Sequence, residues 1–175
     1  MTGSLIGPRV TLRPAVEADL DAIASVMACP GVLPWWWSFD PEQCRAEIAA
    51  PGPGCRPYVI ECGGEVVGLI QYGEETEAEY RHAYVDLALH DDHQGGGLGR
   101  EALAVLCRHL FEDRGHHRIT IDPAVANHRA VRCYEAVGFR PVGVMRQAEL
   151  GPDGTWHDSL LLDMLTGELV LPAGP

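Results

Sequence analysis

The sequence is short of basic residues and has no long apolar run. Its 175 residues include 13 Lys and Arg against 25 Asp and Glu, a formal net charge of −12. Nucleic-acid binding needs a basic surface opposite the phosphates, so this balance argues against a nucleic-acid partner. No uncharged apolar stretch reaches the roughly 18 residues of a membrane span, and the first residues lack the pattern of a secretory signal. We therefore expect a cytoplasmic protein without a membrane partner.

Paired cysteines and metal-ligand spacings are also missing. None of the six cysteines forms a C-x-x-C pair. Cys107 and Cys133 fall within helical patterns, which favours buried free thiols in a reducing compartment over disulfides. The segment from His90 to His93 is the densest group of potential ligands, but no second ligand pair with zinc spacing accompanies it. We expect a solvated loop there and no metal site.

The acidic surplus itself has two interpretations. An acidic surface attracts a cationic small molecule or a cationic peptide by long-range steering. The same charge also keeps a protein soluble without any such partner.

Hydrophobic patterns predict one α/β domain that spans residues 1–175. The length suits a single domain, and no linker or internal repeat divides the chain. Strands alternate with helices, which is typical of a mixed sheet covered by helices. We expect about seven strands (9–13, 58–62, 66–72, 82–90, 118–122, 140–149 and 156–165) and about four helices (near 20–27, 41–50, 98–112 and 127–137).

A glycine-rich loop, Gln94–Arg100, lies between a predicted strand and a predicted helix. Its four glycines let the backbone approach a ligand closely, and the following helix start adds a partial positive charge. The loop is not a Walker loop, because no Gly-Lys-Ser/Thr follows. It is not the dinucleotide fingerprint either, because Arg100 occupies the third glycine position. Taken alone, it is best interpreted as a flexible turn.

Two motifs together resemble the GCN5-related N-acetyltransferases (GNAT superfamily). Gln94–Gly99 matches the Q/R-x-x-G-x-G/A signature with which that family binds acetyl-CoA. Asn127–Phe139 is similar to the family's N-x-R-A-x-x-x-Y-E-x-x-G-F helix. Both motifs and the order of elements agree over about residues 8–166. The resemblance implies a single-domain GNAT fold, acetyl-CoA as cofactor and N-acetyltransferase activity.

Within the superfamily, the chain is most similar to aminoglycoside 6′-N-acetyltransferases. The pattern over residues 122–139, the aspartate at Asp86 and the tryptophan-rich loop 35–37 carry this similarity. It implies a cationic small-molecule acceptor of the aminoglycoside type. The segments Arg146–Glu149 and Asp153–Asp158 look more like acetyltransferases of protein N-termini, so a protein or peptide α-amine is the alternative acceptor. We expect a monomer or a homodimer.

Two residues are candidates for the chemistry. Asp86 interrupts an otherwise apolar strand, which favours a base or a substrate anchor over a structural carboxylate paired with arginine. The resemblance implies that Tyr134 is the acid that protonates the leaving thiolate, although it also falls on the apolar stripe of its helix. We expect direct attack on bound acetyl-CoA, because only Cys133 is a conceivable cysteine nucleophile. A catalytically silent acetyl-CoA sensor is the non-enzymatic alternative, and the presence of Asp86 and Tyr134 speaks against it.

The resemblance also implies binding residues on both sides of the reaction. Asn127 is in addition a candidate helix cap, and Asp122 either holds an acceptor ammonium or only shapes the turn before Pro123. The tryptophans are either core residues or a cover for the acceptor, and the acidic loop either steers the acceptor or is a solvated tip. The expected cofactor-binding residues are Leu87, Ala88, Leu89, Gln94, Gly95, Gly96, Gly97, Leu98, Gly99, Arg100 and Asn127. The expected acceptor-binding residues are Trp35, Trp36, Trp37, Gln71, Glu77, Glu79, Asp86 and Asp122.

Overall fold

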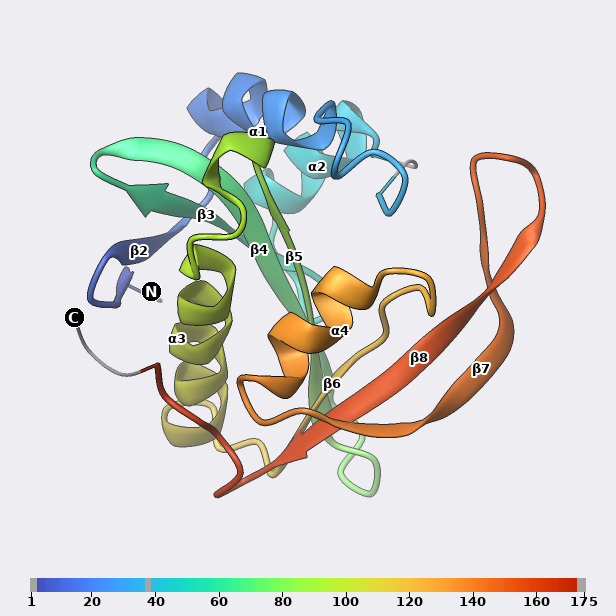
Figure 1. Ribbon diagram of the computed structural model, residues 1–175. Coiled ribbons are helices and arrows are strands. Elements are labelled where there is room, and N and C mark those ends of the chain that lie inside the picture. The colour runs from blue at the N-terminus through green and yellow to red at the C-terminus, as the bar shows by residue number, and fades with distance from the viewer. Residues whose placement is uncertain (1–2, 37–38, 173–175) are drawn as a thin grey trace.

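The computed structural model describes residues 3–36 and 39–172, and Figure 1 shows a central sheet with helices on both faces. In the described residues no helix is long and apolar enough to cross a membrane. The helices are α1 (Leu20–Met27), α2 (Pro41–Ala49), α3 (Leu98–Glu112) and α4 (His128–Glu135). The strands are β1 (Leu5–Ile6), β2 (Val10–Pro14), β3 (Arg56–Cys62), β4 (Glu65–Glu75), β5 (His82–Leu89), β6 (Arg118–Ile121), β7 (Arg140–Leu150) and β8 (Trp156–Leu165).

The sheet has the strand order β1-β2-β3-β4-β5-β6-β8-β7. All neighbours are antiparallel except β5 and β6, which run parallel. The predicted mixed α/β fold with four α-helices is confirmed. The sheet has one strand more than the seven that the hydrophobic patterns indicate, because the two residues of β1 pair with β2. A strand this short leaves no alternation to detect.

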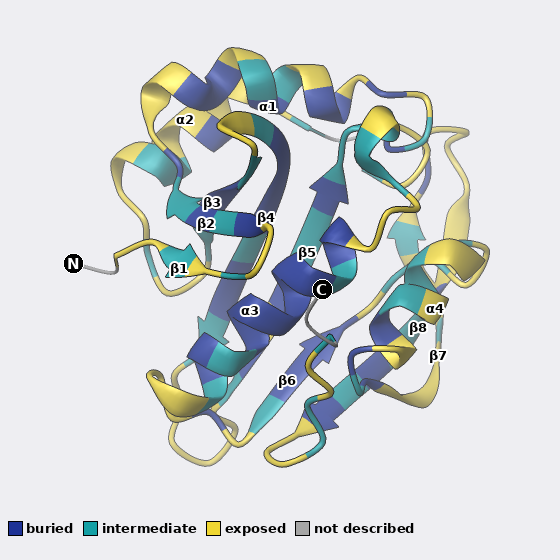
Figure 2. Ribbon diagram, turned by 60° about the vertical axis from the view of Figure 1, so that its left-hand side comes forward, coloured by how far each residue is buried: buried dark blue, intermediate teal, exposed yellow. Residues whose placement is uncertain are grey.

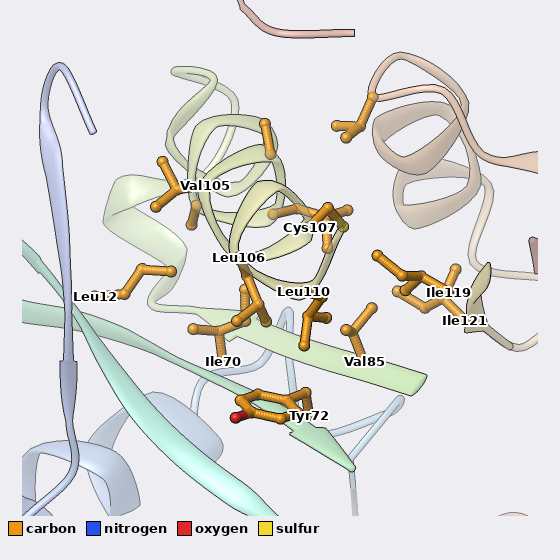
Figure 3. Packing of buried hydrophobic residues seen from close by; sticks show 14 of the residues in the cluster. Leu12, Ile70, Tyr72, Val85, Val105, Leu106, Cys107, Leu110, Ile119 and Ile121 are labelled. Atoms are coloured by element: carbon orange, nitrogen blue, oxygen red, sulfur yellow. The ribbon is translucent and has the colours of Figure 1, made fainter. Parts of the chain in front are cut away.

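The helices bury two apolar clusters on opposite faces of the sheet. On one face, α3 packs Leu103, Leu106 and Leu110 against β4 and β5, and Figure 3 shows Leu106 and Leu110 above Ile70 and Val85. On the other face, α1 and α2 cover a smaller cluster. The buried colouring in Figure 2 follows this division, with α3 almost wholly buried. Alternate side chains of β5 therefore face different helices.

The parallel strands β5 and β6 separate soon after they begin. Only Ala83 and Tyr84 of β5 have partners in β6, while β5 continues to Leu89. The carboxyl-terminal half of β5 thus has no strand partner on that side, and α4 lies beside the opening (Figure 1). Openings at the carboxyl ends of parallel strands are where α/β folds bind ligands.

The hairpin of β7 and β8 is long and bent. The register shifts between Met145 and Glu149, and Gln147 takes a positive φ of 51°. The Gln147 N–H donates to Asp158 Oδ1 of the partner strand at 2.8 Å, which holds this bulge. A bulge redirects the side chains that follow it. In this hairpin Glu149 is the first residue at which strand pairing resumes after the bulge, and it is half-buried.

Candidate active site

The glycine loop forms a tight cradle at the start of α3. Gly97 is the N-cap of the helix and has a φ of 83°, a conformation that only glycine adopts without strain. A Cβ at Gly99 would lie 3.1 Å from Leu89 Cδ1, so a glycine lets α3 approach β5 closely. The N–H groups at a helix start have no partner within the helix. They are therefore available to an anion at this end of β5.

A cleft with a volume of about 330 Å³ lies at this cradle. Four segments far apart in the sequence form its walls, namely the end of β5, the glycine loop, α4 and the loop between α1 and α2. Its size lies at the lower end of the range for small-molecule sites. The lining residues are Gly31, Val32, Trp35, Trp36, Leu87, Ala88, Leu89, Gln94, Gly95, Gly97, Gly99, Arg100, Asn127, Arg129, Ala130, Arg132, Cys133 and Tyr134.

The cleft is basic although the protein is strongly acidic. Arg100, Arg129 and Arg132 all line it. The Nε atom of Arg100 is buried and has no hydrogen-bond partner among the described residues. A buried donor without a partner is costly, and a phosphate oxygen would satisfy it. Arg129 and Arg132 were not among the expected cofactor residues, although both lie within the motif Asn127–Phe139.

Three of the expected cofactor residues have other roles in the structure. The side chain of Gln94 bonds within the protein, donating to Leu89 O at 2.8 Å and to Asp91 Oδ1 at 3.0 Å. Gly96 does not line the cleft, and its carbonyl accepts from Arg9 Nη1 at 2.9 Å. Leu98 is buried in the core under α3, because the first helical turn faces the sheet. Gln94 lines the cleft in addition to making these hydrogen bonds, and the remaining expected cofactor residues line it as well.

Asn127 both caps α4 and lines the cleft. Its side-chain oxygen accepts from the Ala130 N–H at 3.2 Å, which confirms the predicted cap. The cap fixes the entry of α4 beside the opening between β5 and β6. The residues of α4 that line the cleft are thereby held in place.

Tyr134 is a buried residue of α4 at the inner end of the cleft. Its side chain is only 7% exposed and packs on Phe139 with ring centroids 6.3 Å apart. No described residue forms a hydrogen bond with its hydroxyl group, although the residue lines the cleft. Burial raises the pKa of Tyr134, and the charges of Asp86 and Asp122 raise it further. The hydroxyl therefore keeps its proton at neutral pH, and the residue belongs to both the core and the cleft.

Asp86 lies on β5, opposite Gln71 of β4. Burial and the charges of Asp122 and Glu149 together raise the pKa of Asp86 to about 6, although a hydrogen bond from Gln71 acts to lower it. No ion pair between Asp86 and an arginine or lysine occurs in residues 3–36 and 39–172. Ala88, two residues further along the same face of β5, lines the cleft. Asp86 therefore lies about 7 Å from this lining residue, measured along the strand.

Asp86 belongs to a group of three carboxylates, which we call the carboxylate cluster. Asp122 follows the end of β6, and Glu149 lies after the bulge of β7. Burial raises the pKa of Asp122, and burial together with Asp122 raises the pKa of Glu149. An ammonium group placed among these carboxylates would favour their ionised form, because a nearby opposite charge lowers the pKa of a carboxyl group. Sequence reasoning missed Glu149, because a bulge sets its direction.

The acidic loop lies at the other end of the molecule. Glu77 and Glu79 precede β5, and Arg81 after them donates to Arg114 O at 2.7 Å, just beyond the C-terminus of α3. The glycine loop lies at the N-terminus of this 15-residue helix, about 22 Å away along its axis. The structure therefore does not bring Glu77 and Glu79 to the cleft.

Two of the three adjacent tryptophans line the cleft. Trp35 is 36% exposed, and Trp36 packs partly on the cluster beneath α1 and α2. Trp37 lies outside the described residues. The loop between α1 and α2 thus brings aromatic surface to the wall opposite α4.

A basic cleft at a helix start, open between two parallel strands, is typical of enzymes that hold a phosphate-bearing cofactor. Comparison with protein families makes this class specific. The model of the acetyltransferase (GNAT) family matches residues 25–139, and the chain belongs to that family. The protein is accordingly an N-acetyltransferase, and acetyl-CoA is its cofactor.

Characterised relatives point to amines of more than one kind. The chain is 29% identical to an aminoglycoside N(6′)-acetyltransferase type 1 of Klebsiella pneumoniae over 164 residues, 83% of this chain and 79% of the relative. It is 24% identical to a spermidine N(1)-acetyltransferase of Escherichia coli, over 77% of this chain and 74% of the relative. Among solved structures, Mycobacterium smegmatis RimJ in complex with CoA-disulfide shares 29% identity with a TM-score of 0.80, covering 98% of this chain and 90% of RimJ.

Proposed function

We propose that this acetyltransferase modifies a primary amine of a cationic small molecule of the aminoglycoside type. The carboxylate cluster carries the proposal. The charges of Asp86 and Asp122 act on Tyr134, Glu149 acts on Asp86, and no lysine or arginine of the described residues pairs with Asp86 or Asp122. A compound with several ammonium groups would satisfy more than one of them. The relatives named for aminoglycosides and spermidine support this, since both compounds carry several amines.

The residues of the cleft fit acetyl-CoA. The N–H groups at Gly97 and the unpartnered Nε of Arg100 suit its phosphates, and Leu87–Leu89 offer an apolar strand to its pantetheine arm. When bound, acetyl-CoA supplies an activated acetyl thioester. The positive cleft and the negative cluster would thus hold two ligands of opposite charge on either side of Tyr134.

Asp86 acts as the base in this proposal. Its pKa of about 6 leaves it mostly ionised at neutral pH, as a base must be before it takes a proton. The amine arrives as an ammonium ion and attacks only after losing that proton. Asp86 accepts it directly or serves as the anchor that orients the ammonium, and Asp122 and Glu149 bind further positive charges.

Tyr134 acts as the acid. Its raised pKa keeps a proton on a hydroxyl that has no described partner inside the protein. That proton is therefore free for a departing sulfur. With Tyr134 on α4 as the acid and Asp86 on β5 as the base, direct attack requires no covalent enzyme intermediate.

A protein or peptide α-amine is the second candidate acceptor. The segments Arg146–Glu149 and Asp153–Asp158, which look like transferases of protein N-termini, form the outer part of the β7–β8 hairpin. In addition, β7 is the last strand of the sheet, so its free edge offers backbone hydrogen bonds to an extended peptide.

Release of CoA thiol in the presence of separate acceptors tests the proposal. We expect turnover with kanamycin and a loss of roughly a hundredfold in kcat/KM in Asp86→Asn. Turnover of peptide amines alone would favour the second candidate.

A further inference from the structure

Four residues form a closed ring of hydrogen bonds at the mouth of the cleft. The Gly31 N–H donates to Asp91 Oδ2 at 2.9 Å, and Gln94 Nε2 donates to Asp91 Oδ1 at 3.0 Å. Arg129 Nη1 donates to Gln94 Oε1, and Arg129 Nη2 donates to the Gly31 carbonyl at 3.2 Å. We call this arrangement the Gly31 ring. It joins α4, the glycine loop and the loop between α1 and α2.

The ring connects the two sides of the site. Gln94 begins the glycine loop, and Arg129 lies in the first turn of α4, on the cofactor wall. Gly31 lies in the loop that carries the tryptophans. Hydrogen-bonded turns connect the next residue, Val32, to the tryptophans. The Trp35 and Trp36 N–H groups both donate to Val32 O, at 2.9 and 3.1 Å. A displacement at Gly31 is therefore transmitted directly to both tryptophans.

The position of Gly31 tolerates no side chain while the ring is intact. A Cβ there would lie 2.4 Å from Asp91 Oδ1 and 3.3 Å from Asp91 Oδ2. The φ of Gly31 is not positive, so the requirement is one of space and not of backbone strain. Asp91 joins the two loops, since one of its oxygens accepts from Gly31 and the other accepts from Gln94.

We propose that the Gly31 ring couples acetyl-CoA binding to the order of residues 28–36, and so to acceptor affinity. The proposal rests on the function proposed above for this cleft. Arg129 uses two of its five N–H donors in the ring, which leaves others for a phosphate oxygen. An anion that fixes the guanidinium also fixes the Gly31 carbonyl, and Asp91 holds the same residue from its N–H. Asp91 and Arg129 are positioning residues in this account.

Coupling of this kind is reciprocal. If acetyl-CoA raises the affinity for the acceptor by some factor, the acceptor raises the affinity for acetyl-CoA by the same factor. Factors of about five or more are usual for coupled sites. A merely structural role for Asp91 would change thermal stability but not the response of the loop to the cofactor.

Amide hydrogen exchange of residues 28–36, measured by mass spectrometry with and without saturating CoA, tests the coupling. In the wild-type protein we expect CoA to slow exchange there about fivefold or more. Asp91→Ala should still bind CoA in calorimetry but lose this slowing. Asp92→Ala removes a neighbouring carboxylate that is 85% exposed and outside the ring, and it should respond like the wild type. Equal slowing in Asp91→Ala and the wild type would overturn the proposal.

Gly31→Ala gives an independent test if Asp91→Ala is too unstable. The added methyl group displaces the Asp91 carboxylate, so CoA-dependent slowing should again be lost, and retained slowing would contradict the ring. Kanamycin turnover separates this result from the proposed function. If CoA slows exchange in a way that depends on Asp91 but kanamycin is not turned over, the proposed coupling is supported and the proposed acceptor is refuted. Kanamycin turnover together with slowing that is independent of Asp91 would refute the ring alone.

Discussion

Gln71 on β4 lies directly opposite Asp86 on β5 and donates a side-chain hydrogen bond to its carboxylate. Cys55 Sγ lies 3.5 Å from Gln71 Oε1, which leaves the amide nitrogen of Gln71 facing Asp86. This hydrogen bond opposes burial and the neighbouring carboxylates, all of which raise the pKa of Asp86. The balance gives a pKa of about 6, just below neutrality. Gln71 therefore lowers the pH above which Asp86 is ionised and can act as the proposed base.

The first prediction concerns Gln71→Leu. Loss of a hydrogen bond to the ionised carboxylate should raise the pKa of Asp86 further, by roughly one unit. Because the base acts when ionised, kcat/KM rises with pH through this pKa, and the rise should move to higher pH in the variant. Asp86→Asn should lack the rise. Profiles of kcat/KM from about pH 5 to about pH 8 measure it, and an unmoved rise would argue against Asp86 as the base.

Tyr134→Phe tests the acid. Since a proton on the leaving sulfur matters only in the transition state, kcat should fall about a hundredfold while the acceptor KM stays near the wild-type value. Tyr84→Phe is a matched control, because Tyr84 donates its hydroxyl hydrogen to Gly54 O outside the cleft. Steady-state kinetics of the three proteins give the comparison. Wild-type kcat in Tyr134→Phe would exclude this role.

The carboxylate cluster predicts a charge-dependent acceptor KM. Asp122→Asn and Glu149→Gln should each raise the KM for kanamycin several-fold and weaken its dependence on salt, because screened attraction supplies part of the binding. Glu77→Gln with Glu79→Gln removes the same charge at the far end of α3 and should change the KM less. If the acidic loop has the larger effect, the acceptor approaches from that end.

Gly97→Val should weaken acetyl-CoA binding. A β-branched residue at a φ of 83° is strained by roughly 1–2 kcal/mol, and the helix start would have to shift to relieve it. The expected loss of affinity is about tenfold or more. Gly143→Val is the control, since its added Cβ meets nothing within 4 Å and its φ is not positive. Calorimetry with CoA measures both, and equal affinity would contradict the cradle.

Most of the residues that contiguous sequence indicates for the cofactor line a single cleft. The residues of the glycine loop lie close together in the chain, and so do those of the α4 motif. The sequence pattern alone therefore predicts how each group is arranged. Asp86 could be found because it breaks an apolar strand.

The acceptor side depends on contacts that no local pattern records. Glu149 reaches the carboxylate cluster through a bulge whose partner, Asp158, lies on the next strand. Asp91 was expected only as part of a solvated loop, and its role comes from a loop 60 residues earlier. Glu77 and Glu79 were expected at the acceptor because of their charge, although the order of the chain already places the acidic loop before β5 and the glycine loop after it.

The acceptor is tested most directly by comparing kcat/KM for kanamycin with kcat/KM for a peptide α-amine in one CoA-release assay. We expect a clear preference for kanamycin, one that falls as salt increases and falls again in Asp122→Asn. Efficient acetylation of the peptide with no turnover of kanamycin would contradict the proposed acceptor.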